Sequence, residues 1–265
     1  MGWPRIRKTG ASALLVVGCL LSASGCGGSG RAQQPVTPPD GGSAVAPGGP
    51  AAGSPAAGSP AAGSPAAPAR SAAAAPRIIR ALIPYPARRR SQMADYSRRH
   101  YGVAAWRLRN PRRVVLHYTA GGTAAGTRAT FAANTPNRGE LPGTCAHYVV
   151  DKNGDIARLV PDTIRCRHAI GLNHVSLGIE MVQDAMSPPG AAERQILARG
   201  PQIRAALRLV RYLLDKHHLP IGAVIGHGTA NDDRLFRDDE GWRNDHVDWP
   251  APQVREFRRR LRGLR

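Results

Sequence analysis

The chain has 265 residues and a formal net charge of +19, with 37 Lys and Arg against 18 Asp and Glu. This charge indicates a surface drawn to polyanions such as acidic wall polymers or anionic lipid headgroups, although arginine clusters also occur on plain solvated surfaces. The arginines are not interleaved with aromatic residues and no nucleic-acid-binding motif accompanies them, which argues against nucleic acid as a partner. The four cysteines form no CxxC pair, so a cysteine-rich zinc site is excluded.

Residues 1–26 look like a lipoprotein-type signal peptide. A basic start precedes the apolar run Ala11 to Leu21, which is too short to span a bilayer as a stable helix. The segment that ends at Cys26 resembles a bacterial lipobox, although Ala23 stands where leucine is usual. We therefore expect an extracytoplasmic lipoprotein of the cell envelope, anchored in the membrane at Cys26. Cys19 is a second candidate for the lipid site, and simple secretion is the alternative.

Residues 27–76 are expected to form a disordered tether rich in Ala, Gly, Ser and Pro. The motif Ala-Ala-Gly-Ser-Pro occurs three times within 51–65. A segment without aromatics and with little large apolar surface cannot offset the entropy of its chain by burial. Frequent proline favours a semi-extended tether, and about 50 such residues could reach on the order of 100 Å.

Residues 77–110 are interpreted as a lead-in segment, with a short helix or turn near 92–101, and residues 111–265 as the main folded domain. Hydrophobic periodicity and turn residues predict the remaining elements. Strands are expected at 113–118, 146–150, 156–160, 176–182 and 221–226, and helices within 123–135 and at 201–218 and 254–264. Asn153-Gly154 indicates a hairpin between the second and third strands. The pattern predicts an α/β fold with a mixed central β-sheet flanked by helices.

Two histidines stand at the ends of predicted strands. His117 precedes a glycine-rich turn, and His227 is followed by Gly228. Two imidazoles and one carboxylate, with an open fourth position, form the ligand set of catalytic zinc. Asp248 is a candidate for the carboxylate. This dispersed pattern is weak by itself, because the chain holds nine histidines and many acidic residues.

A further carboxylate completes the constellation. In the strand 176–182, Leu177 and Ile179 share one face, so Glu180 points to the opposite face. A free carboxylate near such a metal site can accept a proton from water.

Six segments in order resemble one known family. They are Val115-Leu116-His117-Tyr118-Thr119, residues 146–154, residues 167–174, Gly178-Ile179-Glu180, Gly226-His227 and His246-Val247-Asp248-Trp249. Together they resemble the zinc-dependent N-acetylmuramoyl-L-alanine amidases of the amidase-2 type, which include phage lysozyme-amidases and the peptidoglycan recognition proteins. The resemblance extends over roughly residues 92–262, and it implies that 111–265 is a zinc amidase catalytic domain with an amidase-2 fold.

The resemblance implies a role for each matching residue. His117, His227 and Asp248 match the Zn2+ ligands, and Glu180 matches the catalytic carboxylate that assists the water. Asp245 competes with Asp248 as the third ligand, and Asp248 is favoured because its spacing from His246 preserves the family pattern. His246 falls where many members carry a lysine that stabilises the developing oxyanion, and histidine would do that work here. The resemblance also suggests substrate contacts on the loop and first hairpin strand, by His147, His168 and Asn173. For the loop residues, hydrogen bonds that stabilise the loop are an equal alternative.

The resemblance implies a peptidoglycan hydrolase that cleaves the amide between N-acetylmuramic acid and L-alanine of the stem peptide. Its partner would be peptidoglycan or a muropeptide, and we expect a monomer. The alternatives are a non-catalytic peptidoglycan-binding module of the same fold, or a zinc hydrolase of another acyl-peptide amide. Whether Cys145 and Cys166 form a disulfide stays open, because the sequence does not give their separation.

Overall fold

A computed structural model of the chain describes residues 75–264. The expectations for the signal peptide, and those for the tether up to residue 74, lie outside this range. The strands are β1 (Ile78–Arg80), β2 (Arg113–Tyr118), β3 (Tyr148–Val150), β4 (Ile156–Arg158), β5 (Ser176–Met181) and β6 (Val224–Gly226). The helices are α1 (Ala87–Tyr101), α2 (Ala124–Ala133), α3 (Ala191–Ala198), α4 (Gly200–Lys216) and α5 (Ala251–Arg262).

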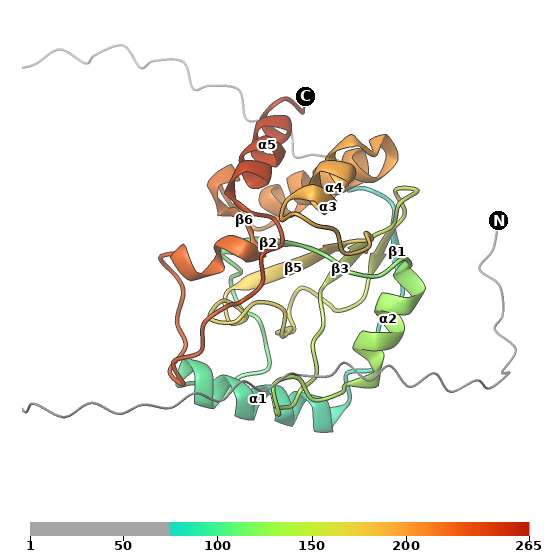
Figure 1. Cartoon of the computed structure of the whole chain (residues 1–265). Helices are drawn as coiled ribbons and strands as arrows, with labels where there is room; N and C mark the ends of the chain where they lie inside the picture. The colour runs from blue at the N-terminus through green and yellow to red at the C-terminus, as the bar shows by residue number, and fades with distance from the viewer. Residues whose placement is uncertain (1–74, 265) are drawn as a thin grey trace, which may run out of the picture. The chain divides into compact units, whose positions relative to one another are not determined.

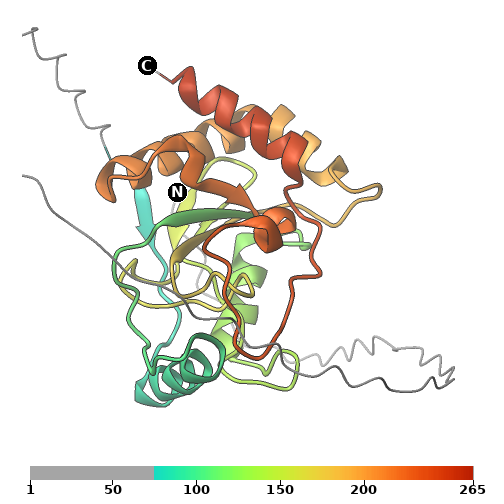
Figure 2. The ribbon, with the colours of Figure 1, turned by 90° about the vertical axis from the view of Figure 1, so that its left-hand side faces the viewer.

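The strands form one six-stranded sheet in the order β1-β4-β3-β5-β2-β6. Only the β3–β4 hairpin is antiparallel among the named pairs, and the other neighbours run parallel. Helices α3, α4 and α5 cover one face of the sheet, and α1 lies on the opposite side (Figures 1 and 2). The predicted mixed sheet flanked by helices is therefore confirmed. No helix within residues 75–264 is both long and apolar enough to span a membrane.

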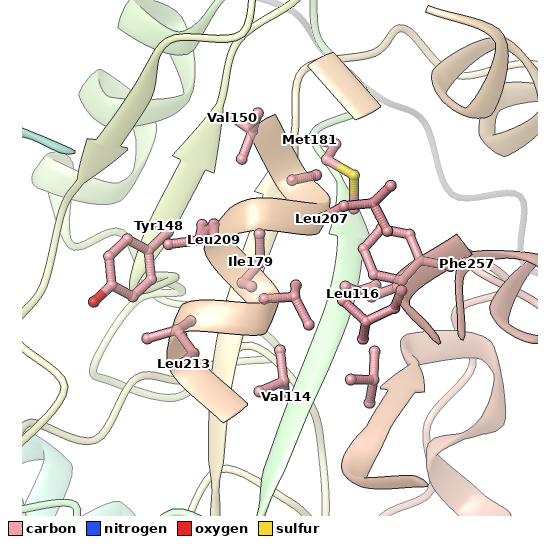
Figure 3. Packing of buried hydrophobic residues seen from close by; sticks show 14 of the residues in the cluster. Val114, Leu116, Tyr148, Val150, Ile179, Met181, Leu207, Leu209, Leu213 and Phe257 are labelled. Atoms are coloured by element: carbon pink, nitrogen blue, oxygen red, sulfur yellow. The ribbon is translucent and has the colours of Figure 1, made fainter. Parts of the chain in front are cut away.

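Alternation along the central strands separates the core from the cleft. Leu116 of β2 and Ile179 of β5 point toward α4, where they pack with Leu209 and Leu213 (Figure 3). The next residue of β2 is His117, which therefore points to the other face of the sheet. Burial of the apolar face fixes the strand register, because a slip by one residue would bring every core side chain to the wrong face.

The structure differs from the sequence expectations at three places. The lead-in segment contributes β1, which pairs with β4, and a longer helix than expected that begins directly after Pro86. Helix α3 was not predicted, because its eight residues follow a proline- and glycine-rich turn and are too few to show a clear period. In the predicted strand 221–226, the first three residues form a 3-10 turn and only Val224–Gly226 pair with β2.

Candidate active site

A cleft of about 670 Å³ opens where β2, β5 and β6 end. Parallel α/β sheets present their ligand sites at the carboxyl ends of the strands. His117 lies near the end of β2, and its Cα partner on β5 is Glu180. His227 follows β6 directly, and Asp248 comes from the loop before α5. All four residues are at most 8% exposed and line the same cleft.

Three of these side chains bring their donor atoms together. Nδ1 of His117 lies 3.1 Å from Nδ1 of His227 and 3.4 Å from Oδ2 of Asp248. Nδ1 of His227 lies 3.0 Å from Oδ1 of Asp248. Ligand atoms placed tetrahedrally at about 2.0–2.1 Å from zinc are about 3.3 Å apart. The two histidine nitrogens and the two oxygens of the Asp248 carboxylate therefore lie at distances close to those between zinc ligands, and one donor atom from each residue lies within 4.8 Å of the others.

The protonation and hydrogen bonding of His117, His227 and Asp248 also favour a bound cation. The two facing Nδ1 atoms cannot both carry a proton at 3.1 Å, so a nitrogen lone pair points into the space between them. The buried Oδ1 of Asp248 lies 3.0 Å from Nδ1 of His227, but among the described residues no contact to this oxygen has hydrogen-bond geometry. A buried carboxylate oxygen without a donor is costly unless a positive charge compensates it. The cluster could hold a divalent metal with nitrogen and oxygen ligands.

Burial shifts the pKa values of the cluster residues. Burial, followed by the neighbouring His227, lowers the pKa of His117 to about 4. Burial alone would raise the pKa of Asp248, but contacts with His117 and His227 outweigh burial and lower it. At neutral pH the site therefore combines a neutral His117 with an ionised Asp248, which are the ligand forms that bind a metal.

Glu180 has a different environment from Asp248. Its Oε2 is buried and makes no hydrogen bond within the described part of the chain. Burial, and then the charge of Asp248, raises the pKa of Glu180 to about 8. Two carboxylates in one cleft thus have pKa values pushed apart, which is the usual signature of an acid–base group beside an anionic ligand. A bound cation would favour the ionised form of Glu180 and oppose this shift.

His168 supports His117 from behind. Nδ1 of His168 lies 3.1 Å from Nε2 of His117, and the far nitrogen of His168 lies 3.3 Å from Oγ of Ser176. The ring packs over Gly178, where a Cβ would lie only 2.7 Å from its Cγ. A hydrogen-bonded partner on the second nitrogen fixes the orientation of a metal-binding histidine. His168 also lines the cleft, so its contact with His117 is compatible with the predicted substrate role.

The other two predicted substrate residues are engaged inside the protein. His147 is fully buried, with Nδ1 accepting from the Gly178 amide at 3.0 Å and Nε2 at 2.9 Å from the Ile164 carbonyl oxygen. Asn173 is also fully buried, and its Oδ1 accepts from two backbone amides of the loop, those of His168 and Ala169. These contacts favour loop stabilisation over substrate contact for both side chains.

His246 and Asp245 lie at the mouth of the cleft. The side chain of His246 is 63% exposed and its ring stacks on His227, with ring centroids 4.4 Å apart. The ring therefore faces solvent and the cleft together. The Asp245 carboxylate is more exposed and lies 3.5 Å from Nη1 of Arg138. Asp248, not Asp245, joins the two histidines, because the exposed loop turns Asp245 away from them.

Sequence reasoning missed Glu193, a residue of α3. Its buried Oε1 accepts a hydrogen bond of 2.5 Å from the backbone amide of Trp249, the residue after Asp248. Trp249 has a left-handed backbone, with φ of 53°, and its carbonyl packs where Gly226 has no side chain. A left-handed non-glycine residue persists only when its surroundings hold it. No local pattern could reveal this contact, because 56 residues separate its partners.

The chain is similar to one protein family and to several solved structures. The Amidase_2 family, described as N-acetylmuramoyl-L-alanine amidase, matches residues 107–248. No curated protein matches the chain.

Solved structures with similarity include the amidase LysC from Clostridium intestinale URNW, with 19% identity, coverage of 71% of this chain and 98% of that one, and a TM-score of 0.42. The endolysin amidase LysCS from the same organism has 20% identity, coverage of 58% and 83%, and a TM-score of 0.38. The Ph2119 endolysin from Thermus scotoductus MAT2119 bacteriophage Ph2119 has 23% identity, coverage of 57% and 85%, and a TM-score of 0.36.

Proposed function

The chain belongs to the Amidase_2 family, the N-acetylmuramoyl-L-alanine amidases, and from this premise we propose that it cleaves peptidoglycan with a zinc ion held by His117, His227 and Asp248. The bond cut is the amide between N-acetylmuramic acid and L-alanine of the stem peptide. The observation that carries the proposal is that Nδ1 of His117, Nδ1 of His227 and the Asp248 carboxylate lie 3.0–3.4 Å apart, buried at the base of a cleft that Glu180 also lines.

The chemistry divides between the metal and the side chains. When bound, a zinc ion polarises a carbonyl and lowers the pKa of water toward neutrality. Glu180 accepts the proton that water loses as its oxygen attacks the lactyl carbonyl carbon. The same carboxyl group then delivers this proton to the nitrogen of L-alanine, and the carbon–nitrogen bond breaks. A carboxyl group held near neutral pKa can serve in both directions.

His246 is proposed to stabilise the negative oxygen that develops on the attacked carbonyl. Its exposed ring stands beside His227 at the cleft mouth and can donate a hydrogen bond from either nitrogen. A donor placed at a developing oxyanion is worth about 10²–10³ in rate. Replacing His246 with alanine should lower kcat in this range and leave the zinc content unchanged.

The test measures metal content and product together. The purified chain is assayed for zinc and then incubated with a purified muropeptide, and the products are identified by mass spectrometry. We expect one zinc per chain and a free stem peptide with an L-alanine amino terminus. Glu180→Gln should keep the zinc and stop turnover. Tight muropeptide binding without cleavage would instead identify a recognition module.

A matched pair of variants tests the ligand set. Asp248→Asn should lose zinc and activity, whereas Asp245→Asn should keep both, because Asp245 is exposed and outside the cluster. The reverse result would refute the assignment. Each variant replaces one aspartate with the isosteric amide. The pair therefore controls for the loss of one negative charge in this loop.

We further propose that the chain is exported and anchored through a lipid on Cys26, and that it acts as a monomer. The Cys145–Cys166 disulfide supports export, since disulfides persist mainly in oxidising compartments. Labelling with a radioactive fatty acid in cells tests the anchor. The wild-type chain and the Cys19→Ser variant should take up the label, and the Cys26→Ser variant should not. Light scattering of the purified protein tests whether it is a monomer. Label retained by Cys26→Ser would refute this site.

A further inference from the structure

The helical layer formed by α3, α4 and α5 carries much of the positive charge. The two segments Ala191–Lys216 and Ala251–Arg262 contain eleven arginine and lysine residues and three acidic ones, which gives a net charge of +8. Of the three acidic side chains, Glu193 is buried, Asp215 is half-buried, and Glu256 pairs with Arg259 and Arg260. The exposed surface of the layer is therefore strongly cationic.

The exposed arginines of the three helices belong to one surface. Arg211 of α4 donates to the Leu261 carbonyl of α5, and Arg260 of α5 donates to the Leu197 carbonyl of α3. These contacts hold the helices side by side as one layer (Figure 1). We name its exposed arginines the cationic face: Arg194, Arg204, Arg208, Arg255, Arg259 and Arg262.

The cationic face and the cleft lie on opposite sides of the sheet. Leu116 and Ile179 point toward α4 (Figure 3), whereas their neighbours His117 and Glu180 line the cleft. A partner that covers the helices would therefore leave the cleft open. Ile78 of β1, near the start of the described chain, packs against the core beneath the helices.

We propose that the cationic face binds a bilayer rich in anionic lipid headgroups and holds the domain with its cleft turned away from the membrane. A lipid surface fits because the exposed arginines are spread over three neighbouring helices of one layer and not gathered in one pocket. Each arginine near an anionic bilayer strengthens binding about fivefold. The orientation rests on the proposed export of the chain, since it places the cleft toward substrate outside the membrane.

The experiment uses vesicles and the full chain carrying Cys19→Ser and Cys26→Ser, so that no lipid on the protein contributes. Binding is measured by co-sedimentation with phosphatidylcholine vesicles, with and without phosphatidylglycerol. We expect binding only to the anionic vesicles, weakened by added salt because exposed charges are screened. The triple variant Arg204→Gln, Arg208→Gln, Arg255→Gln should bind about 100-fold more weakly.

A control removes the same charge elsewhere. Arg88→Gln, Arg90→Gln, Arg98→Gln changes three exposed arginines of α1, on the other side of the sheet, and should lose less than about fivefold. Equal loss in both triple variants would overturn the proposal, as would absence of binding to anionic vesicles, or binding to soluble polyphosphate alone. Both variants should cleave a soluble muropeptide at the wild-type rate. If neither the wild type nor the two triple variants cleaved the muropeptide, the amidase mechanism would be refuted. The vesicle measurements would still test the cationic face.

Discussion

Glu193→Ala is expected to weaken zinc binding although Glu193 is not a ligand. The carboxylate holds the backbone amide of Trp249, and Trp249 follows the proposed ligand Asp248 directly. Without this acceptor the left-handed backbone at Trp249 loses one of its restraints. The carboxylate of Asp248 would then be placed less precisely against His117 and His227.

The size of the effect follows from burial. Trp249 is fully buried, so its amide cannot turn to water when the acceptor is removed. A buried donor without a partner costs about 1–3 kcal/mol. If the loop relaxes to avoid that cost, the same free energy appears as lost metal affinity, which corresponds to roughly 10–100-fold. Glu193→Gln keeps an acceptor oxygen and should restore most of the affinity.

Competition with a chromophoric chelator measures zinc affinity, and chemical denaturation of the metal-free protein measures folding stability. Arg194→Ala is the control, because it changes the exposed neighbour on the same helix and should leave zinc affinity unchanged. Wild-type zinc affinity in Glu193→Ala, with only a loss of stability, would refute the positioning argument. Equal weakening in Glu193→Gln would show that the charge, and not the hydrogen bond, matters.

Three other predictions follow from buried contacts near the sheet. Gly178→Ala should displace the His168 ring and lower the free energy of unfolding by about 1–3 kcal/mol. In denaturation experiments, the double variant with His168→Ala should lose less stability than the sum of the two single variants, and additive losses would contradict this contact. His147→Ala should destabilise the fold by about 1–3 kcal/mol through the unpaired Gly178 amide and leave KM for a muropeptide unchanged, and a raised KM would instead favour the predicted substrate role. Burial alone would raise the pKa of Asp162, but hydrogen bonds from His217, Lys216 and Tyr148 outweigh it and lower that pKa, so its stabilisation is present above the unfolded value of about 4 and is lost as pH falls. The difference in melting temperature between wild type and Asp162→Asn should therefore shrink below about pH 4, and a difference that stays constant with pH would sink this explanation.

The sequence by itself determined the fold class, the central strands and the candidate ligands. Alternation in 176–182 predicted which side chains of that strand face the core, and it placed Glu180 on the face opposite Ile179. These are local patterns of period two, which a single stretch of chain contains in full. The ordered motifs around His117, His227 and Asp248 predicted the family that the match to residues 107–248 then showed.

Tertiary structure decided what depends on distance between remote segments. It brought Asp248 and not Asp245 to the histidines, paired Cys145 with Cys166, and placed Glu193 against Trp249. It also turned His147 into the core, with both ring nitrogens engaged. Such contacts join residues from 17 positions apart, for His147 and Ile164, to 131 positions apart, for His117 and Asp248, and they are fixed by how helices and loops pack on the sheet. Hydrophobic period and turn chemistry carry no record of that packing, so no stretch of sequence could reveal these contacts alone.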